Sequence, residues 1–157
     1  VKRVISAQKA YITGYALTIT TAIETLLKSY YSTGKRNIPN DEIGFTISEL
    51  DKTEIREEIK RRLIGMINNI FGQEKADDII RDLINDGNLE NKYYDSWKTL
   101  RNSVNHGKEP TNDFQEYLNL CETNLVFFHI LILRLIGYTG AYTDYSSYGY
   151  PYVEMEK

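Results

Sequence analysis

Leu125-Val-Phe-Phe-His-Ile-Leu-Ile-Leu-Arg-Leu-Ile136 is the longest apolar stretch of the chain and the one that decides its fold. Ten of its twelve side chains are apolar, so a helix formed here is apolar on nearly every side. Such a helix is either buried in the centre of a domain or shared with a partner subunit. We expect both, with a helix over 113–136 in the core and residues 125–136 at a homodimer interface. The apolar run itself is too short to span a bilayer, which needs about 20 residues, so no membrane segment is predicted.

Four more helices are predicted upstream, because apolar side chains recur at spacings of three and four residues. Residues 33–48 contain Gly34, Pro39 and Gly44 and are predicted to be a connection. The final segment, 137–157, contains six of the 13 tyrosines and is predicted to be an irregular tail, packed on the bundle or stacked on RNA bases. The fold class is therefore all-α, a bundle of about five helices that ends in the long apolar one. The upstream helices are predicted over 7–32, 52–71, 74–86 and 93–105.

Length and composition favour one soluble domain over residues 1–157. The net charge of −3 argues against a protein that coats nucleic acid without specificity, because such proteins are usually basic. Cys121 is the only cysteine, which precludes an internal disulfide and is typical of a reducing cytoplasm. The chain starts at Val1 and not at methionine, as expected for the C-terminal part of a longer protein with a sensor domain before Val1; removal of a tag or processing would give the same start.

A polar segment stands just before the apolar helix: Trp97-Lys-Thr-Leu-Arg101-Asn102-Ser-Val-Asn-His106-Gly107. It holds one of only two histidines. Lys98, Arg101 and Lys108 fall within eleven residues that include no acidic side chain, so the segment is a local positive island in an acidic chain. Gly107 is predicted to end the helix.

Helical geometry places the polar residues of this segment on different faces of the predicted helix. Residues four apart on a helix lie about 40° apart around the axis, and residues five apart about 140°. Asn102 and His106 therefore share one face, where the amide could hydrogen-bond the imidazole and fix its tautomer. Arg101 cannot reach the same imidazole within a regular helix. Unwinding at Gly107, or a two-fold partner that brings a second copy, would gather Arg and His around one phosphate.

These residue types suit metal-free cleavage of RNA. An imidazole with a pKa of about 6.5 can take a proton from a ribose 2′-hydroxyl near neutral pH. A guanidinium can stabilise the negative charge that develops on the phosphate. The alternative is structural: His106 interacts with the last carbonyls and the helix dipole, while Arg101 pairs with a surface carboxylate.

Other polar residues have structural interpretations. Glu24 stands four residues before Lys28 and is predicted to form a weak surface pair with it. The alternative is that Glu24 turns back into the active groove of the bundle. His129, between two apolar residues, is predicted to be a core or interface histidine. Two histidines and one cysteine without ligand spacing cannot build a zinc site, and no glycine-rich phosphate loop is present, so no metal or cofactor is predicted.

The hexapeptide Arg101-Asn102-Ser-Val-Asn-His106 resembles the motif of the HEPN superfamily, an arginine followed by a polar residue, three more residues and a histidine. It stands where that family has it, at the end of the helix before a long apolar one. Its context, together with Arg134-Leu-Ile-Gly-Tyr-Thr-Gly-Ala-Tyr142 after the long helix, resembles the ApeA-like HEPN branch of bacterial abortive-infection proteins. The resemblance covers roughly residues 10–145. Lys108 occupies the position where HEPN toxins paired with nucleotidyltransferases carry a tyrosine.

The resemblance implies a homodimer with the motif at the subunit interface and metal-independent endoribonuclease activity in phage defence. Arg101 and His106 would be catalytic and Asn102 would support them, while Lys98 and Lys108 would bind RNA. Two other functions remain open. One is a non-catalytic RNA-binding or dimerisation module that regulates an attached sensor domain, and the other is a purely structural helical dimer.

Overall fold

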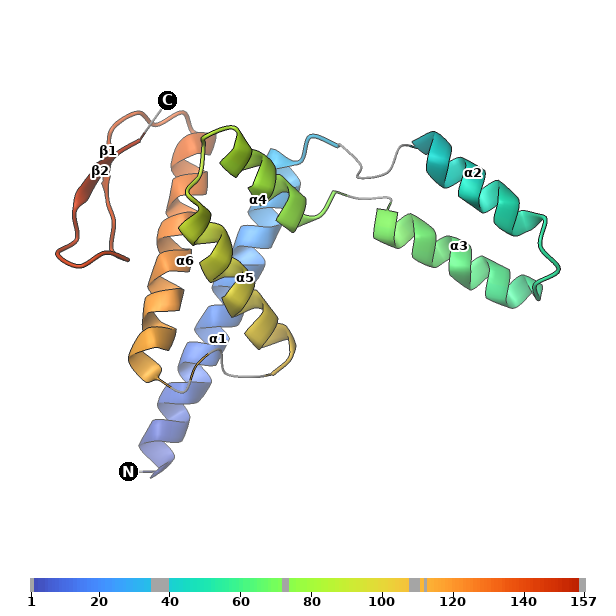
Figure 1. Cartoon of the computed structure of the whole chain (residues 1–157). Coiled ribbons are helices and arrows are strands. Elements are labelled where there is room, and N and C mark those ends of the chain that lie inside the picture. The colour runs from blue at the N-terminus through green and yellow to red at the C-terminus, as the bar shows by residue number, and fades with distance from the viewer. Residues whose placement is uncertain (1, 35–39, 72–73, 108–110, 112, 156–157) are drawn as a thin grey trace.

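The apolar helix predicted from the sequence is the centre of the fold. A computed structural model describes residues 2–34, 40–71, 74–107, 111 and 113–155. Helix α6 spans Phe114–Leu135 and begins after Asp113, whose carboxylate accepts a hydrogen bond from the Gln115 backbone N–H at 2.8 Å. It packs against α1 and α5 (Figure 1). The large apolar side chains that it buries in this core include Val126, Phe127, Ile130 and Leu131.

Helix α1 supplies the largest surface for α6. It spans Lys2–Leu26 and continues as a π-helical turn, η1, over Leu27–Tyr31. The Tyr31 hydroxyl donates to the backbone carbonyl of Leu131, which ties the end of η1 to α6. The helix predicted from residue 7 to residue 32 is confirmed. Its buried stripe, at spacings of four and three residues, consists of Ile12, Ala16, Ile19, Ile23 and Leu27.

Helices α4 (Ala76–Asn85) and α5 (Asn91–Asn105) complete the core. The turn between them contains Gly87, whose positive φ of 72° is a backbone conformation that glycine adopts without strain. Helix α5 contacts both α1 and α6 and buries three large aromatic side chains, Tyr93, Tyr94 and Trp97. The four helices α1, α4, α5 and α6 therefore share one hydrophobic core.

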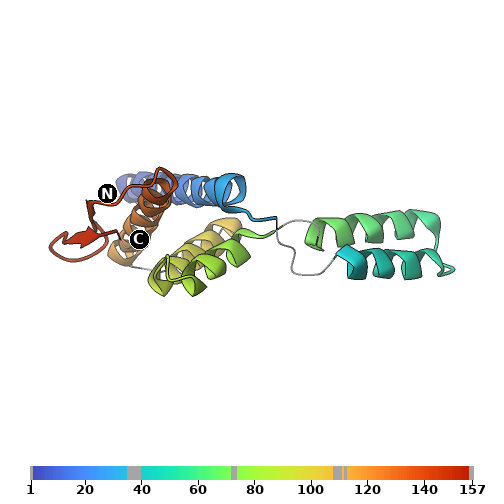
Figure 2. The same ribbon diagram turned by 90° about the horizontal axis from the view of Figure 1, so that it is seen from above.

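Helices α2 (Asn40–Asp51) and α3 (Glu57–Phe71) form a separate arm. Figures 1 and 2 show the two helices side by side, projecting away from the other four. Ile43 is buried between them, and Lys60 donates to the backbone carbonyl of Asp51 at 2.9 Å, which closes the arm at its turn.

The arm corrects the prediction that residues 33–48 form a connection. That prediction is wrong from residue 40 onward, because Gly44 lies inside α2, where a glycine costs only about 1 kcal/mol relative to alanine. Ile43, Ile47 and Leu50 recur at helical spacing and supply the packing that offsets this cost. The helix predicted from residue 52 begins instead at Glu57.

The tyrosine-rich tail also differs from the irregular segment that was expected. Strands β1 (Ala141–Thr143) and β2 (Tyr152–Glu154) pair antiparallel, with Tyr142 opposite Val153. Asp144 follows β1 and is buried, and its carboxylate accepts hydrogen bonds from Ser146 and Ser147. We call residues 141–154 the tail hairpin. The all-α fold class is confirmed, with this hairpin as a small addition at the C-terminal end.

Replacing Phe127 by alanine tests the central position of α6. Phe127 is fully buried and its ring stacks on Tyr93 at a centroid distance of 5.9 Å. We expect Phe127→Ala to lower the free energy of unfolding by about 3–5 kcal/mol, because it leaves a cavity in the shared core. Urea denaturation followed by circular dichroism measures this loss.

The matched control for this prediction is Phe45→Ala on α2. Phe45 is 66% exposed, so its truncation is expected to change the free energy of unfolding by less than about 0.5 kcal/mol. Equal losses in the two variants would show that α6 is not the centre of the fold.

Candidate functional site

Arg101 is held by an ion pair that crosses the bundle. Its side chain, 36% exposed, leaves the last turn of α5 and donates from Nε and Nη2 to Oε1 of Glu24 on α1, at 3.2 and 2.8 Å. The guanidinium also lies over the Trp97 ring, 5.4 Å from the ring centre. Two hydrogen bonds to a carboxylate and one aromatic face restrict the rotamers of a long side chain. The arginine is therefore positioned before any ligand arrives.

Glu24 has one partner that the sequence predicted and one that it did not. The predicted weak pair with Lys28 is present, with the Lys28 Nζ 3.9 Å from the Glu24 Oε1, but the Arg101 Nη2 lies closer to the same oxygen, at 2.8 Å. Glu24 follows the buried Ile23 directly and so stands at the edge of the apolar stripe of α1. That placement beside the core is the signal that could have identified Glu24 as a partner of Arg101, because a carboxylate there can reach the neighbouring helix.

Asn102 and His106 are both exposed on the last turn of α5. The His106 backbone N–H donates to the Asn102 carbonyl at 3.1 Å, which continues the helix to its end. Within the part of the chain that the structure describes, no side-chain hydrogen bond joins the Asn102 amide and the His106 imidazole. The two residues share a face as predicted, but the proposed contact between their side chains is not formed.

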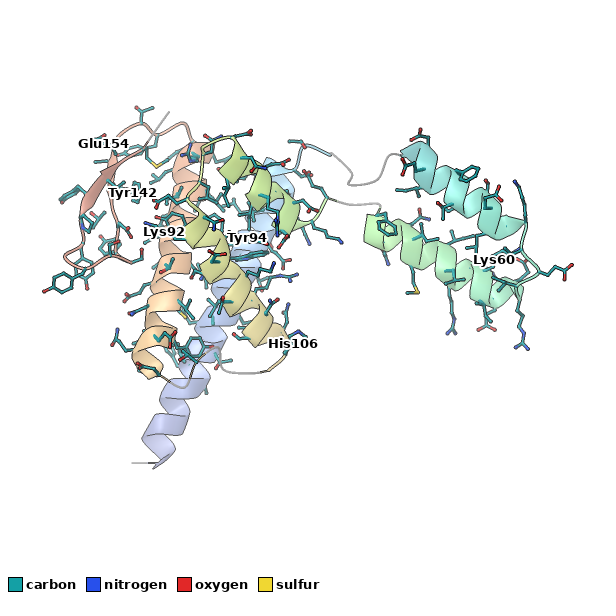
Figure 3. All side chains as sticks on the ribbon, viewed as in Figure 1. Lys60, Lys92, Tyr94, His106, Tyr142 and Glu154 are labelled. Atoms are coloured by element: carbon teal, nitrogen blue, oxygen red, sulfur yellow. The ribbon has the colours of Figure 1, made fainter. Side chains whose placement is uncertain are left out.

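Gly107 ends α5 with a φ of 61°, as the sequence predicts. His106 is the last residue before this turn, so its imidazole stands at the free end of the helix (Figure 3). Lys108, the second predicted RNA-binding lysine, lies outside the described residues.

Lys98 belongs to a hydrogen-bonded cluster around the hydroxyl of Tyr94. That hydroxyl donates to Asp77 Oδ1 at 2.9 Å and accepts from Lys98 Nζ at 2.9 Å and from Arg81 Nη2 at 2.7 Å. Partial burial alone would raise the pKa of Asp77, but the hydrogen bonds from Tyr94 and Arg81 outweigh it and hold that pKa below its usual value. Lys98 is thus fixed on α5 one turn before Arg101, with almost half of its side chain exposed.

A cavity of about 200 Å³ lies beside Arg101. Three lysine or arginine side chains and three carboxylates surround it, and Trp97 forms part of its wall. The Trp97 indole N–H is buried and has no hydrogen-bond partner among the described residues. A group with an acceptor oxygen or nitrogen would satisfy it. The cavity is lined by Glu24, Lys28, Asn69, Glu74, Lys75, Ala76, Asp77, Trp97 and Arg101.

A helical bundle with an arginine and a histidine on the last turn before its long apolar helix is the arrangement of a HEPN domain. The chain belongs to the Apea-like HEPN family, whose sequence profile matches residues 17–141. The match extends from α1 to the start of the tail hairpin and includes Glu24, Arg101 and His106. It confirms the resemblance found in the sequence. Neither the curated proteins nor the solved structures gave a match to this chain.

Helix α6 as a whole is long and apolar enough to cross a membrane by length and composition, although its central apolar run is not. Within the fold this helix packs against α1 and α5, and its buried side chains belong to the shared core. Among the described residues, no three His, Cys, Asp or Glu side chains are grouped so that they could hold a metal ion.

His129, predicted to be a core or interface residue, is exposed on α6, so it is not a core histidine.

A double-mutant cycle tests whether Glu24 anchors Arg101. We expect the Glu24→Ala and Arg101→Ala substitutions to show a coupling energy of about 1 kcal/mol in unfolding experiments, because the pair is short but screened by solvent. The matched cycle of Glu24→Ala with Lys28→Ala should give no more than about 0.3 kcal/mol. Equal coupling in the two cycles would mean that the Arg101 pair is an ordinary surface contact.

Proposed function

We propose that this chain is a metal-independent endoribonuclease domain of a bacterial abortive-infection system that acts in the cytoplasm. Family membership indicates an RNA-related module. The observation that supports catalysis is the orientation of Arg101, which Glu24 and Trp97 hold beside a cavity. Arg101 also stands five residues before the exposed His106. Pre-positioned cations at a site of charge development are the main source of catalysis in phosphoryl chemistry.

The proposed reaction uses groups of the protein alone. The His106 imidazole accepts the proton of a ribose 2′-hydroxyl, and the 2′-oxygen forms a bond to the adjacent phosphorus. The bond from phosphorus to the 5′-oxygen breaks, and the leaving oxygen takes a proton from a second imidazole or from water. Arg101 stabilises the additional negative charge on the phosphate oxygens. Asn102 supports His106, and Lys98 and Lys108 bind the RNA backbone.

Arg101 and His106 of one chain form only half of this site. They are five residues apart on α5, so their side chains point about 140° apart. A second copy that brings its own α5 opposite the first would place an arginine of one chain near a histidine of the other. The proposed site is therefore composite and lies at the interface of a homodimer.

An apolar groove offers a surface for this dimer. It lies on α1 and α6 next to the exposed Leu17, and its lining is mostly apolar or threonine. Thr21 lines the groove and stands three residues before Glu24, so the groove adjoins the Arg101 ion pair on the surface of α1. Of the predicted interface residues 125–136, Phe128 lines this groove, whereas Val126, Phe127, Ile130 and Leu131 are buried within the monomer. The complete lining is Leu17, Thr18, Thr21, Ala22, Thr25, Leu26, Tyr30 and Phe128.

A second candidate function is a non-catalytic RNA-binding or dimerisation module attached to a sensor domain. The observation that favours it is the same ion pair, because Glu24 neutralises Arg101 and leaves it fewer free N–H groups for a phosphate. The two functions share the fold and the groove. They differ in whether RNA is cut.

Cleavage of labelled single-stranded RNA in the presence of EDTA tests the proposed activity. We expect the purified protein to cut, and His106→Ala and Arg101→Ala to reduce the rate at least roughly 100-fold, as expected for loss of an acid–base group or a phosphate ligand. The control is His129→Ala, which removes the other histidine and should leave the rate unchanged. Bound but uncut RNA would favour the non-catalytic module, and equal cutting by His106→Ala would refute the assigned role of His106.

Sedimentation equilibrium tests the dimer surface. We expect a dimer at micromolar concentration, and at least about tenfold weaker association for Leu17→Glu, because it places a charge in the apolar groove. The control is Phe45→Glu on the arm, an exposed site of similar chemistry that should not affect association. A monomeric wild-type protein at these concentrations would exclude the composite site.

A further inference from the structure

A second cavity, of about 220 Å³, lies near the start of α5, at the end of the helix away from the polar motif. The turn between α4 and α5, the end of α6 and the tail hairpin enclose it. Figure 3 shows Tyr142 and Glu154 on the tail hairpin and Lys92 near the start of α5, at the opposite end of that helix from His106. The lining residues used below are Asn88, Leu89, Glu90, Tyr93, Ile130, Arg134, Glu154 and Met155.

Two buried donors that line this cavity lack acceptors. The Tyr93 hydroxyl and the Arg134 Nε have no hydrogen-bond partner among the residues that the structure describes. Tyr93 is only 1% exposed, and the Tyr142 side chain lies close enough to its hydroxyl to help raise its pKa. Burial raises the pKa of Tyr93, so the hydroxyl keeps its proton and can donate. An unsatisfied buried donor costs about 1–3 kcal/mol, and two of them lie in one cavity.

Arg134 also lacks a counter-charge. Its Nη1 donates to the side-chain oxygen of Asn88 at 3.0 Å, which is a neutral partner. In the described part of the chain, no carboxylate lies within ion-pair distance of its guanidinium. Glu90 lines the same cavity but pairs with Lys92 at 3.3 Å. A partly buried guanidinium without an anion is unfavourable unless a ligand supplies one.

The cavity is large enough for a small organic molecule. Its volume is several times the share of about 30 Å³ that one water molecule occupies in the liquid. Leu89, Ile130 and Met155 give it an apolar wall, against which water gains nothing. A ligand that fits has a compact apolar body and one group of acceptor oxygens.

We propose that this cavity binds a small organic carboxylate, whose oxygens accept hydrogen bonds from Arg134 Nε–H and from the Tyr93 hydroxyl. Its apolar body rests on Leu89, Ile130 and Met155. A single negative charge suits the site better than a phosphate dianion, because Glu90 and Glu154 also line the cavity and repel the second charge. This site lies apart from the motif on α5, and it does not depend on whether the protein cuts RNA.

Titration of the full ¹⁵N-labelled chain with benzoate, benzamide and inorganic phosphate tests the proposal by NMR. We expect benzoate to bind saturably in the millimolar range, with shifts centred on residues 87–93 and 130–134. Benzamide has the same shape without the charge and should bind at least about tenfold more weakly. Inorganic phosphate should give no saturable shifts at these residues.

Two variants and one control complete the test. Arg134→Met removes the guanidinium, and Tyr93→Phe removes only the hydroxyl while its ring remains stacked on Phe127, so the second variant keeps the core intact. Both should weaken benzoate binding at least about tenfold. Arg81→Met removes an exposed arginine on α4 and should leave benzoate binding unchanged. The proposal is overturned by absence of saturable benzoate binding, by equal binding of benzamide or phosphate, or by unchanged binding in Tyr93→Phe.

Discussion

The ion pair between Arg101 and Glu24 is the constraint on which the rest of the candidate site depends. It joins the last turn of α5 to the second half of α1 and sets the guanidinium over Trp97, itself buried in the core. The geometry of the site therefore depends on the folding of the bundle, because each contact of Arg101 comes from a core helix. A site built on rigid helices can hold its groups ready for a phosphate.

The same rigidity keeps Arg101 and His106 on different sides of α5 within one chain. Helix α5 stays regular to Asn105, so Arg101 and His106 keep the angle that separates them. A flexible loop could bring them together, but a helix with this packing does not bend at low cost. We infer that association of two chains, and not a change within one, completes the proposed site. The apolar groove beside Glu24 supplies a place for that association.

The sequence predicted the bundle, its central helix and its family, because long apolar periodicities and the motif before α6 are strong local signals. It did not predict α2, whose Gly44 and flanking Pro39 are typical of a connection and whose main packing partner is α3. It also missed the partner of Arg101, since Glu24 is 77 residues away and only the crossing of α1 with α5 brings the two together. Likewise, the cavity of Arg134 and Tyr93 depends on the tail hairpin, which no periodicity indicated.

The most direct test of the proposed composite site is the distance between the two copies of α5 in the proposed dimer. A spin label at Asn102→Cys reports it by pulsed electron paramagnetic resonance, since Cys121 is buried and does not compete for the label. We predict a distance below roughly 25 Å, about two helix diameters, between the two labels. A label at Ser48→Cys on the arm serves as a control for labelling and dimer content. A distance above roughly 40 Å between the labels at residue 102, several helix diameters, would contradict the account.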